Sequence, residues 1–335
     1  MRIAINGFGR IGRSVFRILN SMKGIEVAAI NDISDNDALA YLLRHDTVMG
    51  RFPDRIEVEG DMLRTSSQKV KMTEVAEPAG LPWRELGVDY VIEATGRFRK
   101  RAQLESHLAA GAGKVILTVP AKDEIDFTVV IGVNEESLKP EHRIISNASC
   151  TTNCLAPVAR VLHESFGIES GLMNTVHAYT NDQRLADVPH SDWRRSRAAA
   201  ENIIPTTTGA ARAVGKVLPE LAGRLDGMAM RVPIPDGSIV DLVAVLRQDV
   251  TVARVNEAMR DASATERLRE ILLYSEEPIV SSDIVGDPHS CVFDAPFTRV
   301  VDGRVLKTLS WYDNEWGYAN RVVDLLKLLD RLGGR

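Results

Sequence analysis

A short glycine-rich motif near the start of the chain most constrains its fold. Residues 7–12 have the sequence GFGRIG and fit the pattern G-x-G-x-x-G. The motif directly follows the apolar run Ile3–Asn6, which predicts a strand, and it opens a helical pattern over Arg10–Ser21. In such a unit the glycines permit a tight turn and let the backbone approach a pyrophosphate at the helix N-terminus. We therefore expect Gly7, Gly9 and Gly12 to contact a dinucleotide, the alternative being a purely structural glycine-rich turn.

The residue that ends the next predicted strand favours one cofactor. Asp32 follows the run Val27–Asn31 and lies twenty residues after Gly12. A carboxylate at this position accepts hydrogen bonds from the adenosine ribose, whereas it repels a 2′-phosphate. No arginine follows Asp32 directly to compensate that repulsion. The sequence therefore predicts NAD rather than NADP. Flavin remains an alternative that the same motif serves, although flavin chemistry would not require a nucleophilic thiol.

The two parts of the chain follow different patterns. Up to residue 150, short apolar runs alternate with helical stretches, which is typical of a doubly wound parallel sheet, the Rossmann fold. After Cys150, longer alternating runs such as Ser238–Arg247 indicate an α+β domain with a mostly antiparallel sheet. We expect an α/β protein with a cofactor domain of residues 1–149 and 316–335, whose C-terminal helix packs back on it. Residues 150–315 would form the catalytic domain.

Composition excludes several classes of protein. The 335 residues carry a formal charge of −5, so nothing general attracts the chain to nucleic acid or to an anionic membrane. No run reaches the length of a membrane span, and the N-terminus does not resemble a signal peptide. Three cysteines are too few for a disulfide framework, which indicates a reducing compartment and a cytoplasmic protein. No His and Cys cluster has metal-site spacing, so we expect no metal.

A thiol stands at a predicted helix start. Cys150 follows the strand-like run Arg143–Ile145 and lies in SNASCTTNC, residues 146–154. Free N–H groups and the partial positive charge of a helix N-terminus favour thiolate over thiol. Cys150 is therefore a candidate nucleophile with a lowered pKa, although free cysteines are also common as small buried apolar residues.

Among the seven histidines, His177 is the best candidate partner for this thiol. It ends the apolar run that begins at Gly171, at the mouth of a predicted strand. A Cys–His pair can supply thiolate and later move protons. We expect His45, His107, His142 and His163 to be solvated, and His289 to make a structural turn contact.

Anion-binding residue types are concentrated after Cys150 in this acidic chain. Arginines and hydroxyl residues, with a glycine at a helix start, suit phosphate oxygens. Arg231 stands inside an apolar strand, where a solvated arginine is less natural, whereas Arg194 and Arg197 are better explained as surface ion-pair partners. The other candidates are Thr180, Arg195, Thr206, Thr207, Thr208 and Gly209.

Five motifs, in order, closely resemble phosphorylating glyceraldehyde-3-phosphate dehydrogenase over essentially the whole chain. They are residues 6–12 (NGFGRIG), 146–154 (SNASCTTNC), 177–180 (HAYT), 202–211 (NIIPTTTGAA) and 311–318 (WYDNEWGY). The resemblance implies oxidation of glyceraldehyde 3-phosphate to 1,3-bisphosphoglycerate in glycolysis or gluconeogenesis. Cys150 would form a thiohemiacetal whose oxyanion the Cys150 N–H and His177 hold, hydride would pass to the nicotinamide, and phosphate would cleave the resulting thioester.

The resemblance also implies roles for individual residues. Thr180 and Arg231 would hold the substrate phosphate, and Ser149, Thr151, Thr208 and Gly209 the attacking phosphate. Arg195 joins these phosphate-binding candidates. Arg10, Ile11, Asp32 and Asn314 would contact NAD. The family is usually a homotetramer in which the loop from Tyr179 onward lies near a neighbouring cofactor.

The chain departs from the commonest sequence pattern of this family at two positions, and two alternative functions remain. Val119 stands where many members of the family carry serine or alanine, and Cys291 where relatives often have serine, whereas Val188-Pro189 resembles the NAD-preferring form. One rival is erythrose-4-phosphate dehydrogenase, a relative with a weakened second phosphate site that differs where this chain has Thr206–Gly209. The other is a binding protein that uses the same fold without turnover.

Overall fold

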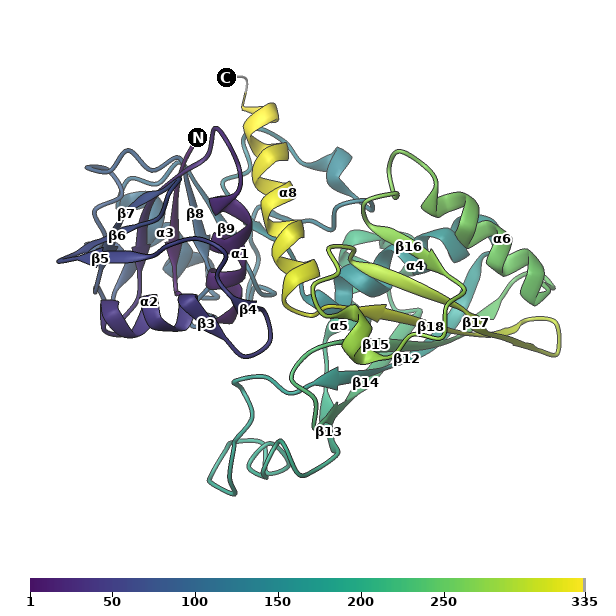
Figure 1. Ribbon diagram of the computed structural model, residues 1–335. Helices are drawn as coiled ribbons and strands as arrows, with labels where there is room; N and C mark the ends of the chain where they lie inside the picture. Colours follow the sequence, from purple (N-terminus) through teal and green to yellow (C-terminus); the bar gives the residue numbers. More distant parts are fainter. Residues whose placement is uncertain (334–335) are drawn as a thin grey trace. The chain divides into compact units, whose positions relative to one another are not determined.

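The computed structural model describes residues 1–333, and its internal contacts divide the chain into two units (Figure 1). Unit 1 comprises residues 1–129, 136–149 and 319 onward. Unit 2 comprises residues 130–135 and 150–318. The chain thus passes between the units at four points, one of which lies between Ser149 and Cys150.

Unit 1 is built on a nine-stranded sheet in the order β10-β11-β9-β8-β1-β2-β7-β6-β5. All neighbours from β10 to β7 pair in parallel, and only β7, β6 and β5 pair antiparallel. The strands of this sheet are β1 (Arg2–Asn6), β2 (Glu26–Asn31), β5 (Glu57–Glu59), β6 (Met62–Arg64), β7 (Lys69–Thr73), β8 (Tyr90–Glu93), β9 (Lys114–Leu117), β10 (Phe127–Thr128) and β11 (Ile144–Ser146).

The central strands of this sheet are apolar because helices and loops cover both faces. Ile3, Ile5 and Val91 are fully buried. Parallel strands buried on both sides read as continuous apolar runs, which is why the sequence showed them clearly. The helices of unit 1 are α1 (Arg10–Asn20), α2 (Asn36–Arg44) and α3 (Arg101–Ala109), and a two-stranded ribbon joins β3 (His45–Asp46) to β4 (Gly50–Arg51).

Unit 2 contains a seven-stranded sheet in the order β13-β14-β12-β15-β18-β17-β16. Four of its six neighbouring pairs are antiparallel, and β12–β14 and β16–β17 are parallel. The strands are β12 (Ile168–Ala178), β13 (Ile204–Thr207), β14 (Leu225–Val232), β15 (Ser238–Leu246), β16 (Leu272–Ser275), β17 (Cys291–Val301) and β18 (Val305–Tyr312). The predicted Rossmann domain and mostly antiparallel second sheet are both confirmed.

Helices α4 (Cys150–Phe166) and α6 (Val252–Ser263) pack on the sheet of unit 2 (Figure 1). Helix α5 (Ala210–Val217) packs on α4 and β14, and α7 (Ser281–Ile284) is a single turn. The last helix, α8 (Trp316–Leu332), begins in unit 2 and continues in unit 1. Short 3₁₀ turns occur at Pro78–Gly80, Glu135–Ser137 and Pro219–Leu221. Within residues 1–333, no helix combines the length and apolar character needed to cross a membrane.

The chain leaves the sheet of unit 1 just after β10. The apolar run 129–131 is typical of a strand, but the ladder is formed by β10, at Phe127–Thr128, and the Val129 N–H still donates to the Ser146 carbonyl at 2.9 Å. The Val130 N–H instead donates to the Asn134 side chain at 2.9 Å, which turns the chain out of the sheet.

Candidate active site

The glycine motif forms a tight turn between β1 and α1. Gly7 has φ of +93°, and a Cβ there would lie 2.6 Å from the Thr95 nitrogen. A Cβ at Gly12 would lie 2.1 Å from the Gly7 carbonyl oxygen. Only glycine fits either position. At Gly9, directly before α1, a Cβ would meet no atom within 4 Å, so this backbone can be approached closely from outside.

Asp32 ties this turn to the end of β2. Its Oδ2 accepts a hydrogen bond from the Phe8 N–H at 2.7 Å, and its Oδ1 accepts one from the Ser34 N–H at 3.1 Å. A cavity of about 270 Å³ opens beside it. The carboxyl ends of β1, β2 and β8 all contribute to its lining, as expected for a ligand site in a parallel sheet; the lining includes Asn6, Gly7, Gly9, Asp32, Ile33, Thr95, Arg97 and Phe98.

A buried hydrogen-bond network supports the polar side of this cavity. Asn31 Nδ2 donates to Asn6 Oδ1 at 2.7 Å, and Asn6 Nδ2 donates to Glu93 Oε2 at 2.5 Å. His107 Nε2 lies 3.0 Å from the same carboxylate oxygen, and Trp83 Nε1 donates to His107 Nδ1 at 3.0 Å. The expectation of a solvated His107 is therefore wrong, because its side chain is fully buried in this network.

Two further cofactor candidates lie at the start of α1. Arg10 is the first residue of the helix, and its Nη1 lies 2.7 Å from both carboxylate oxygens of Asp46. Asp46 has a pKa lowered to about 2, because hydrogen bonds from Arg10 and from backbone N–H groups outweigh the opposing effect of burial. The Arg10 side chain is thus held by an ion pair. Ile11 follows it and is half-buried.

In unit 2, Cys150 and His177 lie together. Cys150 is the first residue of α4, and its Sγ is 3.6 Å from His177 Nε2. His177 is 4% exposed near the end of β12, where it pairs in register with Arg231 of β14. Because β12 and β14 are parallel neighbours, the two side chains meet: Arg231 Nη1 lies 2.8 Å from His177 Nδ1.

Burial and nearby charges shift the pKa values of both Cys150 and His177. Burial raises the pKa of the Cys150 thiol, and the Arg231 guanidinium only partly offsets that effect. The predicted lowering of the Cys150 pKa is therefore wrong. Burial, followed by the Arg231 charge, also lowers the pKa of His177 to about 3, so its imidazole is neutral at pH 7.

The predicted phosphate-binding residues are only partly brought together. Thr151 is buried beside Cys150, and its hydroxyl lies 2.9 Å from that of Tyr312. Thr208 Oγ1 accepts the Ala210 N–H at 3.2 Å, at the start of α5, where Gly209 is exposed.

The remaining candidates lie in the segment that follows β12. Arg195 forms an ion pair with Asp182, and its Nε lies 3.4 Å from Asp192 Oδ2. The Arg195 charge also lowers the pKa of Arg231. Thr180 is half-buried two residues after the end of β12, and Ser149 directly precedes α4. Arg197 forms a surface ion pair with Asp187 at 3.0 Å, as expected.

Asn314 is the second residue after β18 and is 5% exposed. Its Oδ1 accepts a hydrogen bond from Ser238 Oγ at 2.6 Å, and Ser238 Oγ in turn accepts the Ala178 N–H at 3.0 Å. Neither Ser238 nor Tyr312 was singled out from the sequence, because both lie in strands whose alternating pattern predicts packing only.

Two family descriptions match this chain in order. Residues 1–101 match the NAD binding domain of glyceraldehyde 3-phosphate dehydrogenase, and residues 149–314 match its C-terminal domain. The glyceraldehyde-3-phosphate dehydrogenase of Streptomyces coelicolor is 55% identical over 327 residues, 97% of each chain. Those of Geobacillus stearothermophilus (97% of each chain) and Mycobacterium avium (99% of each chain) are 56% and 54% identical. This chain belongs to the glyceraldehyde-3-phosphate dehydrogenase family.

Membership of this dehydrogenase family confirms several predictions. The resemblance seen in the five motifs is correct, the chain is an oxidoreductase, and its N-terminal domain binds NAD. The cavity at the glycine turn fits that cofactor: Gly9 admits close backbone approach, α1 begins beside it, and Asp32 offers carboxylate oxygens.

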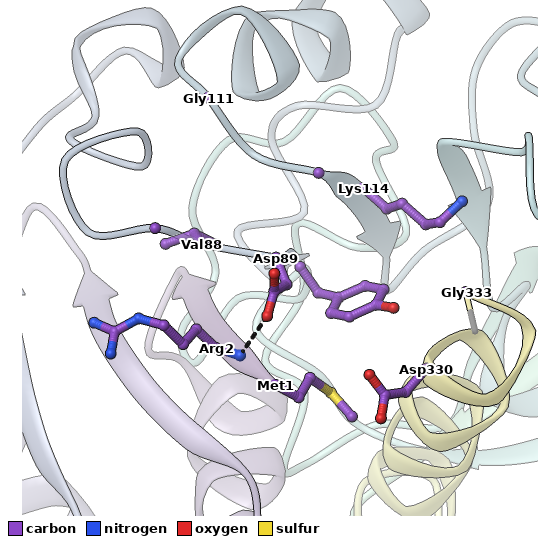
Figure 2. A pocket seen from close by; sticks show the side chains of 11 residues that line it. Met1, Arg2, Val88, Asp89, Gly111, Lys114, Asp330 and Gly333 are labelled. Carbon is purple, nitrogen blue, oxygen red and sulfur yellow. Dashed lines mark hydrogen bonds between the residues drawn. The ribbon is translucent and has the colours of Figure 1, made fainter. Parts of the chain in front are cut away.

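A second cavity in unit 1 lies at the amino ends of the strands (Figure 2). Its volume is about 620 Å³, and its walls include Arg2, Tyr90, Lys114 and Asp330. The Arg2 N–H donates to Asp89 there at 2.8 Å. None of the predicted site residues lines this cavity, and within residues 1–333 no cluster of His, Cys, Asp or Glu could hold a metal.

Proposed function

We propose that this chain is the phosphorylating, NAD-dependent glyceraldehyde-3-phosphate dehydrogenase of glycolysis and gluconeogenesis, with Cys150 as its nucleophile and His177 as its acid and base. The single observation that carries the proposal is the 3.6 Å separation between Cys150 Sγ and His177 Nε2, with Arg231 directly behind the imidazole. These three groups are what covalent catalysis on a phosphorylated aldehyde needs.

The first step is addition of the Cys150 sulfur to the aldehyde carbon. His177, neutral at pH 7, accepts the thiol proton as the C–S bond forms. The backbone N–H of Cys150, at the start of α4, and the imidazole stabilise the oxyanion of the resulting thiohemiacetal. When bound, NAD⁺ supplies the acceptor for the hydride that leaves the same carbon.

The second step frees the enzyme. The protonated His177 first gives its proton to the oxyanion, which becomes the thiohemiacetal hydroxyl, and the imidazole takes this proton back as the thiohemiacetal becomes a thioester. Inorganic phosphate then attacks the thioester carbon, the C–S bond breaks, and the proton on His177 returns to the Cys150 sulfur. The product is an acyl phosphate, and the cysteine is ready for another turnover.

Arg231 couples substrate binding to the base. Its positive charge lowers the pKa of His177, and a substrate phosphate held by Arg231, Thr180 and Arg195 would offset that charge. The imidazole therefore becomes a better base when the substrate is present. For the attacking phosphate we assign Ser149, Thr151, Thr208 and Gly209, since the last two open α5, where backbone N–H groups favour an anion.

For the cofactor we assign Gly7, Gly9, Arg10, Ile11, Gly12, Asp32 and Asn314. The supporting observations are the glycine turn, the cavity beside Asp32 and the hydrogen bond that fixes the Asn314 side chain. We also assign residues 1–149 and 316–335 to the NAD-binding domain and residues 150–315 to the catalytic domain.

We further propose a homotetramer in the cytoplasm. Support for assembly comes from apolar side chains left exposed, among them Leu185 and Trp193 of the loop after β12, which are 85% and 86% exposed. Support for a reducing compartment comes from Cys150, Cys154 and Cys291, which are all free thiols.

A steady-state assay of NADH formation tests the function. With glyceraldehyde 3-phosphate and NAD, sustained turnover should require phosphate or arsenate, and Cys150→Ser should abolish it while leaving NAD binding intact. Faster turnover with erythrose 4-phosphate, independent of phosphate, would instead support the erythrose-4-phosphate dehydrogenase rival, which the family relatives do not favour. NAD binding without any turnover would support the binding-protein rival.

A further inference from the structure

Two carboxyl groups lie buried together beside the Cys150 site. Asp236 is in the loop between β14 and β15, and Asp313 directly follows β18; they are 2% and 1% exposed. Ser238 of β15 pairs in register with Tyr312 of β18, and this brings the two carboxyl groups close enough for each to shift the pKa of the other. In the part of the chain that the structure describes, no lysine, arginine or histidine pairs with either group. Two ionised carboxylates would repel each other strongly here, so one of them needs a proton.

The backbone supports the two carboxyl groups unequally. Asp313 accepts hydrogen bonds from three N–H groups, those of Gly286 at 2.7 Å, Glu315 at 2.8 Å and Trp316 at 2.6 Å. Trp316 also opens α8, and a helix N-terminus favours negative charge. Asp236 accepts only the Gly237 N–H, at 2.8 Å, and its Oδ2 is buried without a donor. Asp313 is therefore the ionised member of the pair.

The charged neighbours of Asp236 reinforce this assignment. Burial, then the charges of Asp313 and Glu315, raise the pKa of Asp236 to about 9. The start of α4 brings Cys150 near enough for an ionised Asp236 to raise the pKa of its thiol. At neutral pH the Asp236 carboxyl thus carries the shared proton.

The same loop fixes Asn314. Ser238, two residues after Asp236, donates to Asn314 Oδ1 at 2.6 Å. The intervening Gly237 has φ of +82°, and a Cβ there would lie 2.1 Å from the Ser281 carbonyl, so the loop is packed tightly against α7. A shift of Asp236 away from Asp313 would therefore move the hydroxyl that orients the Asn314 amide.

We propose that Asp236 is a positioning residue that acts as a neutral carboxylic acid: it donates its proton to Asp313 and thereby holds Ser238 and Asn314 in place. Above about pH 9, loss of this proton sets two negative charges against each other and loosens the loop. NAD affinity then falls. Only this last consequence rests on the proposed function, through the assignment of Asn314 to the cofactor.

The first test uses the protein without cofactor. Asp236→Asn keeps an N–H donor toward Asp313 but cannot ionise. In wild type, Asp236 is protonated when folded and ionised when unfolded between about pH 4 and about pH 9, so the folded state loses stability as pH rises through that window. The Tm of wild type minus that of Asp236→Asn should fall from about pH 5 to about pH 9 and then level off. A difference of one bound proton between the folded and unfolded states changes the equilibrium constant of unfolding by at most about tenfold per pH unit.

Controls keep this test decisive. Asp226→Asn removes an exposed carboxylate from β14, the strand that precedes the Asp236 loop, and should show no such trend relative to wild type. If Asp236→Asn does not fold, Asp236→Ser supplies another non-ionisable donor for the same comparison. A difference in Tm that is constant with pH would overturn the assignment of the proton to Asp236.

The second test measures NAD binding by calorimetry across the same pH range. Wild-type affinity should weaken above about pH 9, whereas Asp236→Asn should hold its affinity. If the stability trend is found but both proteins bind NAD with the same pH dependence, the positioning of Asn314 is wrong. Absence of NAD-dependent turnover would count against the proposed function alone, since the stability test does not depend on it.

Discussion

At the scale of single residues, His177 joins the thiol to the anion site through its two ring nitrogens. Nε2 faces Cys150 Sγ, while Nδ1 lies 2.8 Å from Arg231 Nη1 and 2.7 Å from the Ala178 carbonyl oxygen. A guanidinium can only donate, and a carbonyl can only accept. Nδ1 can satisfy only one of them at a time, so the tautomer of His177 depends on where Arg231 points.

The role of His177 as acid and base predicts the effect of His177→Asn. Asparagine keeps an N–H donor near the sulfur but cannot take a proton. We expect kcat/KM for glyceraldehyde 3-phosphate to fall by about 10²–10⁴, with NAD affinity unchanged. Steady-state kinetics and calorimetry measure the two quantities. A loss of less than about threefold would show that another group moves the proton.

The Arg231 charge predicts a shift in thiol reactivity with pH. Because Arg231 lowers the pKa of Cys150, Arg231→Met should raise that pKa further. The rate of Cys150 alkylation by iodoacetamide follows the thiolate, so its pH curve should move to higher pH in the variant. Arg197→Met removes a surface arginine paired with Asp187 and serves as the control. Identical curves for Arg231→Met and wild type would contradict the assigned coupling.

The sequence patterns predicted where the site residues lie better than they predicted the pKa values of those residues. Cys150 and His177 could be proposed as neighbours because one follows a strand end and the other ends a long apolar run. The direction of the Cys150 pKa could not be predicted, since it depends on burial by elements remote in sequence. The burial of Asp236 and His107 could not be predicted for the same reason, because their partners Asp313 and Glu93 lie 77 and 14 residues away along the chain.

At the scale of elements, strands at sheet edges escaped prediction. β13 and β16 are the outermost strands of the second sheet, and each has only four residues. β13 contains Pro205, and β17 contains Pro296 where its register with β18 shifts. Proline is tolerated at such edges and irregularities but breaks the alternating pattern. The interior strands β1 and β15 were predicted closely because their apolar patterns are uninterrupted, whereas the irregular interior strand β17 was not predicted.

The turn between β17 and β18 predicts a measurable stability effect. Val301 pairs with Val305, and Asp302 and Gly303 between them both have positive φ, +51° and +67°. Gly303→Ala should lower the free energy of unfolding by about 1–2 kcal/mol, the cost of a left-handed alanine. Denaturant unfolding measures it. Gly209→Ala, where φ is −93° and a Cβ meets nothing within 4 Å, should have a smaller effect; equal losses would contradict the argument.

At the scale of the whole molecule, the two sheets could be distinguished from the sequence, but the course of the chain between the units could not. The change from short parallel-type runs to long alternating runs coincides with the passage at Ser149 and Cys150. The assignment of residues 130–135 to unit 2 has no local signal. It rests on partners such as Arg267, whose guanidinium donates to the Gly132 carbonyl 135 residues away.

Cofactor choice can be tested through the stability of the whole protein, because a ligand that binds only the folded state stabilises it by RT ln(1 + [L]/Kd). We expect NAD to raise the Tm more than NADP at equal concentration, since the Asp32 carboxylate repels a 2′-phosphate. Asp32→Asn retains an amide oxygen for the Phe8 N–H, which donates to Asp32 at 2.7 Å, but removes the charge. The variant should therefore narrow the difference between the Tm shifts caused by NAD and by NADP, measured by thermal unfolding.

Asp37→Asn, at an exposed acid of α2, serves as the control and should leave the difference as in wild type. If Asp32→Asn also left it unchanged, the discrimination would have to come from elsewhere in the cavity, where Arg97 is the charged residue to test next.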